Sequence, residues 1–167
     1  MSQTKAEESV SNLVNELFGS QMNKTVKEQI DQIKIQVVQE EDENAQPAMI
    51  ILMPIKILDF VHANFTVFKK KLDKIFHNHY FFFIRTPQIN FLSKTINENT
   101  QEKWIFDLCY PAELQNRVTE IKNGGTIKIE KAMLERRCDF LPEDFTRMEN
   151  AYKTLTKKTI IYSLRHY

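Results

Sequence analysis

The clearest pattern of apolar and polar positions lies in residues 48–85. Residues 48–53, Ala-Met-Ile-Ile-Leu-Met, predict a strand that is buried on both faces, and Pro54 ends it. In residues 58–75 the apolar side chains recur at alternating steps of three and four, which is typical of one amphipathic helix. Residues 80–84, Tyr-Phe-Phe-Phe-Ile, predict a second buried strand. The stretch therefore predicts a β-α-β unit.

The chain before this unit predicts two helices and a strand. Apolar positions within residues 10–18 indicate an amphipathic helix, and Gly19 is placed to end it. A short helix is expected over residues 24–29. Residues 33–37 alternate between apolar and polar, as in a half-buried strand. The polar, acidic residues 40–47 are expected to form a solvated connection, which we favour over a metal or partner site.

The last third of the chain predicts a hairpin between two helices. Residues 101–108 carry apolar side chains on one side of a helix. Residues 117–130 alternate around Asn123-Gly124-Gly125, the kind of turn in which φ is positive. Residues 145–155 predict a last amphipathic helix, and residues 159–164 a short strand. The expected fold class is α+β: a mixed sheet with one β-α-β crossover, a C-terminal β-hairpin and flanking helices.

Length and charge indicate how the chain is organised. With 167 residues, a single domain is expected over residues 1–167. Residues 1–47 carry four basic and nine acidic side chains, whereas residues 48–167 carry nineteen and thirteen. We therefore expect an acidic N-terminal helical part and a basic α+β body, which suits binding of a polyanion.

Composition argues against several classes of function. Three glycines are too few for the usual phosphate-binding loops, and no Gly-x-Ser-x-Gly elbow is present. Cys109 and Cys138 lack metal or redox spacing, which suits a reducing cytosol. No apolar run approaches the length of a membrane span, and residues 1–8 have no apolar signal core. We predict no enzyme activity, no cofactor and no metal.

Three patterns allow an alternative reading. His77 and His79 could share a strand face and bind a metal, although a helix end and a strand start explain them better. Glu143 and Asp144 could form an acid/base pair, but first-turn helix acids are the favoured interpretation. The aromatic residues 80–83 could stack on RNA bases, but consecutive aromatics favour a strand covered on both sides.

Surface cations remain as the candidate chemistry. Lysines cluster towards the end of the helix predicted over residues 58–75, and Arg85 follows the aromatic strand. Such side chains bind phosphates without reading sequence. From this clustering alone, Lys70, Lys71 and Arg85 are predicted RNA contacts.

Five segments, in the same order and spacing, resemble one known family. They are Ala-Met-Ile-Ile-Leu-Met-Pro at 48–54, Leu-Asp-Lys-Ile-Phe at 72–76, Phe-Phe-Ile at 82–84, Asp-Leu-Cys-Tyr-Pro-Ala-Glu at 107–113 and Tyr-Lys-Thr-Leu-Thr-Lys-Lys at 152–158. With these segments the chain resembles the eukaryote-specific small-subunit (40S) ribosomal protein family seven, in a shortened form.

The resemblance implies a non-catalytic constituent of the small ribosomal subunit. Its implied partners are small-subunit ribosomal RNA and neighbouring small-subunit ribosomal proteins, with no membrane and no small-molecule substrate. It implies a role in subunit assembly and translation, and location in cytoplasmic ribosomes after passage through the nucleolus. By the family pattern, RNA contacts are expected at Arg117, Lys122, Lys153 and Lys158.

The chain departs from the family pattern in two places. The family's long basic insertion after the aromatic strand is replaced by the short residues 88–99, in which Lys94 is the only cation. Val118 and Glu120 stand at hairpin positions that are basic in the family, so RNA contact is not expected there. Two alternatives stay open: a free-standing RNA-binding regulator, and a small metal-dependent hydrolase that uses His77 and His79.

Overall fold

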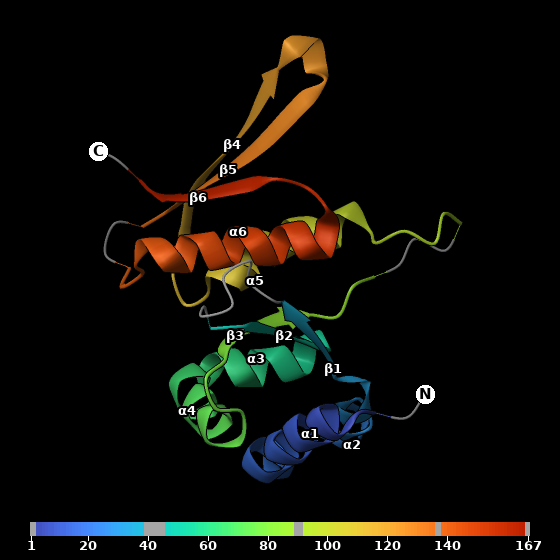
Figure 1. The fold of residues 1–167 in the computed structure, drawn as a ribbon. Coiled ribbons are helices and arrows are strands. Elements are labelled where there is room, and N and C mark those ends of the chain that lie inside the picture. The colour runs from blue at the N-terminus through green and yellow to red at the C-terminus, as the bar shows by residue number, and fades with distance from the viewer. Residues whose placement is uncertain (1–2, 39–45, 89–91, 136–137, 166–167) are drawn as a thin grey trace. The chain divides into compact units, whose positions relative to one another are not determined.

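The chain forms two compact units, unit 1 (Met1–Asn97) and unit 2 (Glu98–Tyr167). The structure is a computed structural model that describes residues 3–38, 46–88, 92–135 and 138–165. Each unit contains a three-stranded mixed sheet with helices (Figure 1), so the predicted α+β class is confirmed. The strands are divided between two sheets, where the sequence predicted one. The boundary between the units does not coincide with the change of charge after residue 47, and folding as a single domain stays a prediction.

Unit 1 begins with helices that carry the predicted apolar stripe. They are α1 (Lys5–Phe18), the 3₁₀ turn η1 (Gly19–Gln21), α2 (Lys24–Lys27) and the 3₁₀ turn η2 (Ile30–Gln32). A reciprocal capping box begins α1: the Glu7 N–H donates to Thr4 Oγ1, and the Thr4 N–H donates to the Glu7 carboxylate. Gly19 ends α1 as predicted, but with φ −56°, because the chain continues directly into a 3₁₀ turn.

The sheet of unit 1 contains the predicted β-α-β unit. Its order is β1 (Lys34–Val38), β2 (Ala48–Met53), β3 (Tyr80–Arg85), with β1 antiparallel and β3 parallel to β2. Along β3, Phe81, Phe82 and Phe83 are all buried. The interpretation of the aromatic run as a buried strand is therefore confirmed over a base-stacking platform.

The predicted long helix of this unit is two helices. They are α3 (Ile55–Ala63) and α4 (Phe65–Ile75), separated at Asn64, which has φ −124° and ψ 35°. The Asn64 side-chain amide donates to the Phe60 carbonyl oxygen at 3.0 Å, so it occupies an acceptor near the end of α3. Asparagine often ends helices by such local hydrogen bonds, and apolar periodicity does not reveal them.

The core of unit 1 lies between one face of its sheet and the helices. Phe83 is at its centre, with its ring centroid 5.3 Å from that of Phe68 and 5.7 Å from that of Phe65. Met49 and Ile51 extend this face along β2, and Val14 packs into the same core from α1. These alternating apolar positions of the strands thus bury the apolar stripes of the helices.

Unit 2 repeats this combination of strands and helices in a different form. Its elements are α5 (Glu98–Cys109), β4 (Leu114–Lys122), the turn η3 (Asn123–Gly125), β5 (Ile127–Leu134), α6 (Pro142–Thr156) and β6 (Ile160–Leu164). The hairpin of β4 and β5 is confirmed, and its three turn residues have φ of 52°, 64° and 94°. β6 runs parallel to β5, so α6 completes a second β-α-β crossover that the sequence did not predict.

The hairpin of unit 2 extends past the third strand. β6 pairs with β5 only from Glu130 onward, so the distal part of β4 and β5 continues as a two-stranded ribbon (Figure 1). Below it, α5 and α6 cover one face of the sheet, where Trp104 is fully buried and the Tyr162 hydroxyl donates to the Ile105 carbonyl oxygen at 2.8 Å. None of the helices in the described parts of the chain is long and apolar enough to cross a membrane.

Candidate nucleic-acid interface

A cleft of about 490 Å³ lies beside the hairpin ribbon of unit 2. Its walls are the first turn of α5, the distal part of β5 and the segment that joins α6 to β6, and Tyr152 is a buried lining residue. Four cationic side chains line it: Arg117, Lys128, Lys157 and Lys158. The open space follows from the strand lengths, because β6 pairs with β5 only from Glu130 to Leu134, and residues 127–129 of β5 are paired with β4 alone among the described strands.

Arg117 is held in the cleft wall by carboxylates. Its Nε lies 3.2 Å from Glu130 Oε2, and its Nη2 lies 3.7 Å from Glu102 Oε1. Glu130 is only 9% exposed and also accepts a hydrogen bond from the Thr119 hydroxyl at 3.2 Å. The buried Glu130 carboxylate is therefore stabilised by Arg117. Because its charge is offset by this carboxylate, Arg117 helps to form the wall of the cleft but adds little net charge to it.

The three lysines of the cleft are differently placed. Lys128, Lys157 and Lys158 are exposed, and none makes an ion pair with a described carboxylate. Lys157 ends α6 with φ 60°, and its N–H donates to the Lys153 carbonyl oxygen at 2.7 Å. Lys157 and Lys158 lie at the C-terminal end of α6, where cations are favoured by the helix dipole, which is the structural reason for the presence of these two lysines. Beyond that reason, their ammonium groups are available to an anion.

The field of the cleft is only weakly positive. Three carboxylates line it, those of Glu98, Glu102 and Glu130, against the four cations. Two of these carboxylates pair with Arg117, so the unpaired charge lies on the side of Lys128, Lys157 and Lys158. This edge is the part of the cleft that suits a phosphate group.

The structure brings together two of the four residues that the resemblance indicated. Arg117 and Lys158, which lie on different elements, line the same cleft. Lys153 is exposed on α6, one turn before Lys157. Lys122 is exposed near the hairpin turn, and its Nζ lies 3.2 Å from Glu120 Oε1.

The three residues chosen from charge clustering all lie in unit 1. Lys70 and Lys71 are exposed on the C-terminal half of α4, next to the exposed Lys74, and form the α4 lysine cluster. Lys69 differs from them because its ammonium lies 5.2 Å from the ring centroid of Tyr80. Arg85 is half-buried at the end of β3. The α4 lysine cluster is thus a second candidate surface for phosphates.

Two of the four cations that line the cleft, Lys128 and Lys157, were not predicted from the sequence. Lys128 alternates with Ile127 and Ile129 in the hairpin, which places it on the opposite strand face from them, and Lys157 adjoins Lys158. Both signals were present in the sequence. These lysines line a cleft because there is free space beside β5, and that space depends on where β6 begins.

Among the residues considered for other chemistry, Asp144 has a structural role. The Leu141 N–H donates to the Asp144 carboxylate at 2.8 Å, as expected of a first-turn helix acid. His79 Nδ1 lies 2.9 Å from the His77 carbonyl oxygen. No group of three or more His, Cys, Asp or Glu side chains suited to a metal was found among the described residues. Burial raises the pKa of the Cys109 thiol to about 12, so this cysteine stays protonated at neutral pH.

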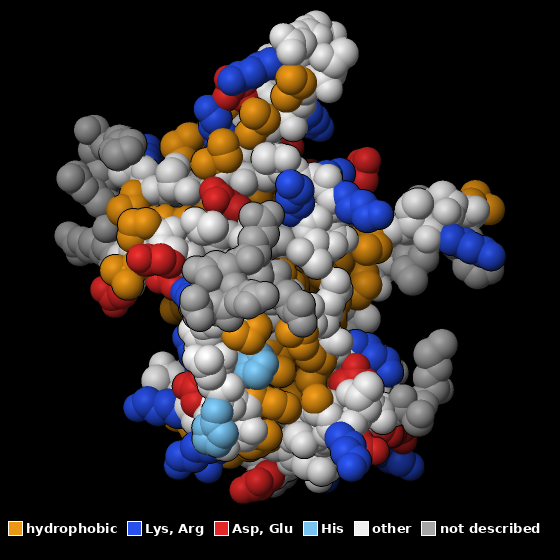
Figure 2. Space-filling model, viewed as in Figure 1, with side chains coloured by type: hydrophobic (Ala, Val, Ile, Leu, Met, Phe, Trp, Pro, Cys, Tyr) orange, Lys and Arg blue, Asp and Glu red, His pale blue; other side chains and the backbone are white. Residues whose placement is uncertain are grey.

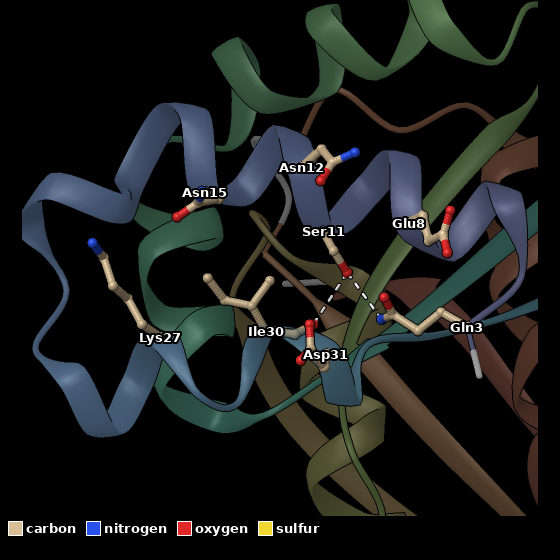
Figure 3. Close-up of a pocket in the computed structure, with 8 residues that line it drawn as sticks. All are labelled: Gln3, Glu8, Ser11, Asn12, Asn15, Lys27, Ile30 and Asp31. Carbon is tan, nitrogen blue, oxygen red and sulfur yellow. Dashed lines mark hydrogen bonds between the residues drawn. The ribbon is translucent and has the colours of Figure 1, made fainter. Parts of the chain in front are cut away.

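A second cleft lies in unit 1, between α1 and the segment of α2 and η2 (Figure 3). Its central polar group is the buried Ser11 hydroxyl, which donates to the Ile30 carbonyl oxygen at 3.1 Å and accepts from Gln3 Nε2 at 3.0 Å. Asn12 and Asn15 lie along the same side of α1. Both hydrogen bonds of the Ser11 hydroxyl are made within unit 1, so the polar group at the centre of this cleft has a structural role.

Comparison with known proteins adds no family. Neither a scan against protein-family models nor a search of curated proteins returned a match to this chain. The five segments that resemble one family, and the placement of the cations, are the features of this chain that bear on its function.

Proposed function

We propose that this chain is a non-catalytic constituent of the small ribosomal subunit that binds ribosomal RNA and neighbouring ribosomal proteins. The observation that carries the proposal is the cleft of unit 2. Two residues that the resemblance indicated, Arg117 and Lys158, meet there with Lys128 and Lys157. A hairpin and the end of a helix, far apart in sequence, thereby present their cations to one space.

The arrangement suits the RNA backbone more than base edges. Lysine ammonium groups bind phosphates as point charges and carry no sequence information. We infer that the protein recognises the position of phosphates in a folded RNA, with Lys128, Lys157 and Lys158 as the primary contacts. Lys153 extends the same edge of α6, and the α4 lysine cluster offers a second surface in unit 1.

The direct test is binding of purified small-subunit ribosomal RNA to the full chain as a function of salt. We expect the double variant Lys157→Glu, Lys158→Glu to bind roughly tenfold more weakly at about 0.1 M salt. The logarithmic salt slope should fall by about 0.7–0.9 for each phosphate contact that is lost. The matched control is the double variant Lys56→Glu, Lys103→Glu, which makes the same change of charge, because Lys56 on α3 and Lys103 on α5 are exposed and do not line the cleft. Equal losses in the two variants would mean that only overall charge matters.

Sedimentation separates a ribosomal constituent from a free-standing RNA-binding regulator. In a lysate of the source cells that contains magnesium, we expect the chain to travel almost entirely with small-subunit particles. High salt should release it, since its contacts with phosphates are electrostatic. A chain found mainly in light fractions at low salt would favour the regulator and contradict the proposal.

A further inference from the structure

We propose that the helix-free face of the unit 2 sheet binds another protein, one that presents apolar side chains with carboxylates beside them. We call this face the docking face. It is formed by alternate residues of β4, β5 and β6, and its exposed apolar members are Val118, Ile127 and Ile161. The inference deepens the proposed function, since it names where on this chain a neighbouring protein binds and by what chemistry.

The strand register places these residues on one face. Val118 lies opposite Lys131 in the β4–β5 pair, and Lys131 lies opposite Ile161 in the β5–β6 pair. Residues directly opposite each other in a sheet share a face, and so do alternate residues along a strand. Ile127 and Ile129 are four and two positions from Lys131 on β5, so they belong to the same face.

The helices of unit 2 cover the other face. Ala132 and Tyr162 lie opposite each other in the β5–β6 pair, and both are buried. Tyr162 is hydrogen-bonded to α5 through its hydroxyl group. Residues along each strand point alternately to this covered face and to the docking face. The docking face is therefore not covered by a helix of unit 2, and its apolar side chains are exposed to solvent.

The exposure is substantial for β-branched aliphatic side chains. Val118 is 41%, Ile127 42% and Ile161 40% exposed, and Ile129 and Met133 are half-buried between them. Figure 2 shows apolar side chains in a row along the hairpin. A contiguous apolar strip of this kind is typical of a protein contact, whereas single scattered apolar residues need no explanation.

The charges on the docking face indicate the sign of the partner. Glu120 lies between two lysines, with Oε1 at 3.2 Å from Lys122 Nζ and Oε2 at 2.5 Å from Lys131 Nζ. All three side chains share the docking face with Val118. One carboxylate for two ammonium groups leaves positive charge beside the apolar strip, which a partner's carboxylates would complement.

The same features disfavour two other occupants. RNA phosphates would gain the lysines but would leave the valine and isoleucine side chains against a polar backbone. A second copy of the chain would bring Lys122 and Lys131 of both copies to the same contact, and like charges across an interface are destabilising. A different protein with an apolar and acidic surface satisfies both the strip and the lysines.

Photocrosslinking from the two faces of the ribbon tests the inference. The full chain would carry benzoylphenylalanine at position 118, and a matched control would carry it at position 121. Ile121 is 65% exposed on the same ribbon but faces the other way, opposite Lys128. In lysate of the source cells, we expect position 118 to give one adduct of discrete mass that protease destroys and nuclease does not.

The lysines must determine the yield of that adduct, because capture of some protein is not sufficient. With benzoylphenylalanine at position 118, Lys122→Glu with Lys131→Glu should lower the yield roughly tenfold. If this variant unfolds, Lys122→Gln with Lys131→Gln serves in its place and should lower the yield by a smaller factor. Lys56→Glu with Lys103→Glu, which makes the same change of charge, should leave the adduct unchanged, because these exposed lysines lie on α3 and α5, outside the docking face and the cleft.

Several results would overturn the docking face. They are a nuclease-sensitive adduct, an adduct at twice the chain's mass, no adduct, equal adducts from positions 118 and 121, and a yield that ignores Lys122 and Lys131. The outcome is separable from the RNA proposal. If the chain does not travel with small-subunit particles but the lysine-dependent adduct persists, the docking face stands and the ribosomal function fails.

Discussion

The two units have the same topology but use it differently. In each unit a helix precedes two antiparallel strands, and a helical crossover leads to a third strand that is parallel to the second. In unit 1 the strands have 5, 6 and 6 residues, so they pair along nearly their whole length. In unit 2 they have 9, 8 and 5 residues. The first two strands of unit 2 therefore extend beyond the third.

This difference in strand length creates the candidate surfaces of unit 2. Beyond Glu130, β5 has no neighbour on its β6 side, and the cleft with Lys128 occupies that space. The ribbon also exposes apolar side chains such as Val118. In unit 1 the strand that corresponds to β5 is β2, and its apolar side chains, such as Ile51, are buried. The same topology therefore forms a packed core when its strands are of similar length, and a projecting hairpin with exposed surfaces when the first two strands are longer than the third.

The largest expected effect comes from the core of unit 1. Phe83→Ala should lower the free energy of unfolding by about 3–5 kcal/mol, because it removes a buried ring and leaves a cavity. Hydrogen exchange resolved by residue measures where protection is lost. If the chain unfolds as one domain, as the sequence predicts, protection falls in both units. Loss confined to residues 1–97 would show that the units unfold separately.

The next effect concerns the buried carboxylate of unit 2. Arg117→Ala should destabilise the protein by about 2 kcal/mol, because Glu130 is left buried without its cation. Adding Glu130→Gln should recover part of this loss, which urea unfolding at neutral pH can measure. An absence of recovery would mean that Arg117 acts through packing alone. In that case the distinction between a side of the cleft where Arg117 is ion-paired and a side where the lysines are not would be wrong.

Two glutamates should give the units opposite responses to pH. Burial by itself would raise the pKa of Glu7, but backbone N–H donors of Thr4 and Ile35 and the charge of Lys34 bring it below its ordinary value. Its contribution is therefore present at neutral pH and is lost as pH falls through the lowered pKa. Burial raises the pKa of Glu149, so its contribution is present in acid and is lost as pH rises through the raised pKa.

Glutamine variants measure these two contributions. Glu7→Gln should cost about 1.5 kcal/mol at pH 7, and the difference from wild type should shrink towards acid pH. Glu149→Gln should have the opposite trend, with its relative stability improving as pH rises. Thermal unfolding between about pH 3 and pH 7 provides the comparison. Parallel curves for the two variants would contradict the opposite shifts.

The smallest effect separates two glycines. Gly125→Ala should destabilise unit 2 by about 1 kcal/mol, because φ is 94° there, although the site has space for a Cβ atom. At Gly19 φ is −56°, and the nearest obstacle to an added Cβ atom is the exposed Asn15 side chain, which can move. The free energy of unfolding should change little in Gly19→Ala. A larger loss at Gly19 than at Gly125 would mean that crowding, and not backbone conformation, selects these glycines.

Local patterns in the sequence were sufficient for most elements. Residues 48–53 and 80–84 are uniformly apolar, and a strand with two covered faces is the structure that explains such runs. Asn123-Gly124-Gly125 predicted the hairpin because positive φ is a property of a few residue types. The helix break at Asn64 was missed, because it depends on hydrogen bonds of one side chain and not on apolar periodicity.

What the sequence determined by itself is the identity of the strands, the helices and the hairpin turn, since each depends on residues close together in the chain. Only the tertiary structure decided that the strands form two sheets, that Arg117 is paired with Glu130, and that Lys128 and Lys158 share a cleft. The physical reason is that strand pairing joins distant residues. The alternation of apolar and polar side chains records which positions are buried, but not which strand lies beside them or where that strand begins.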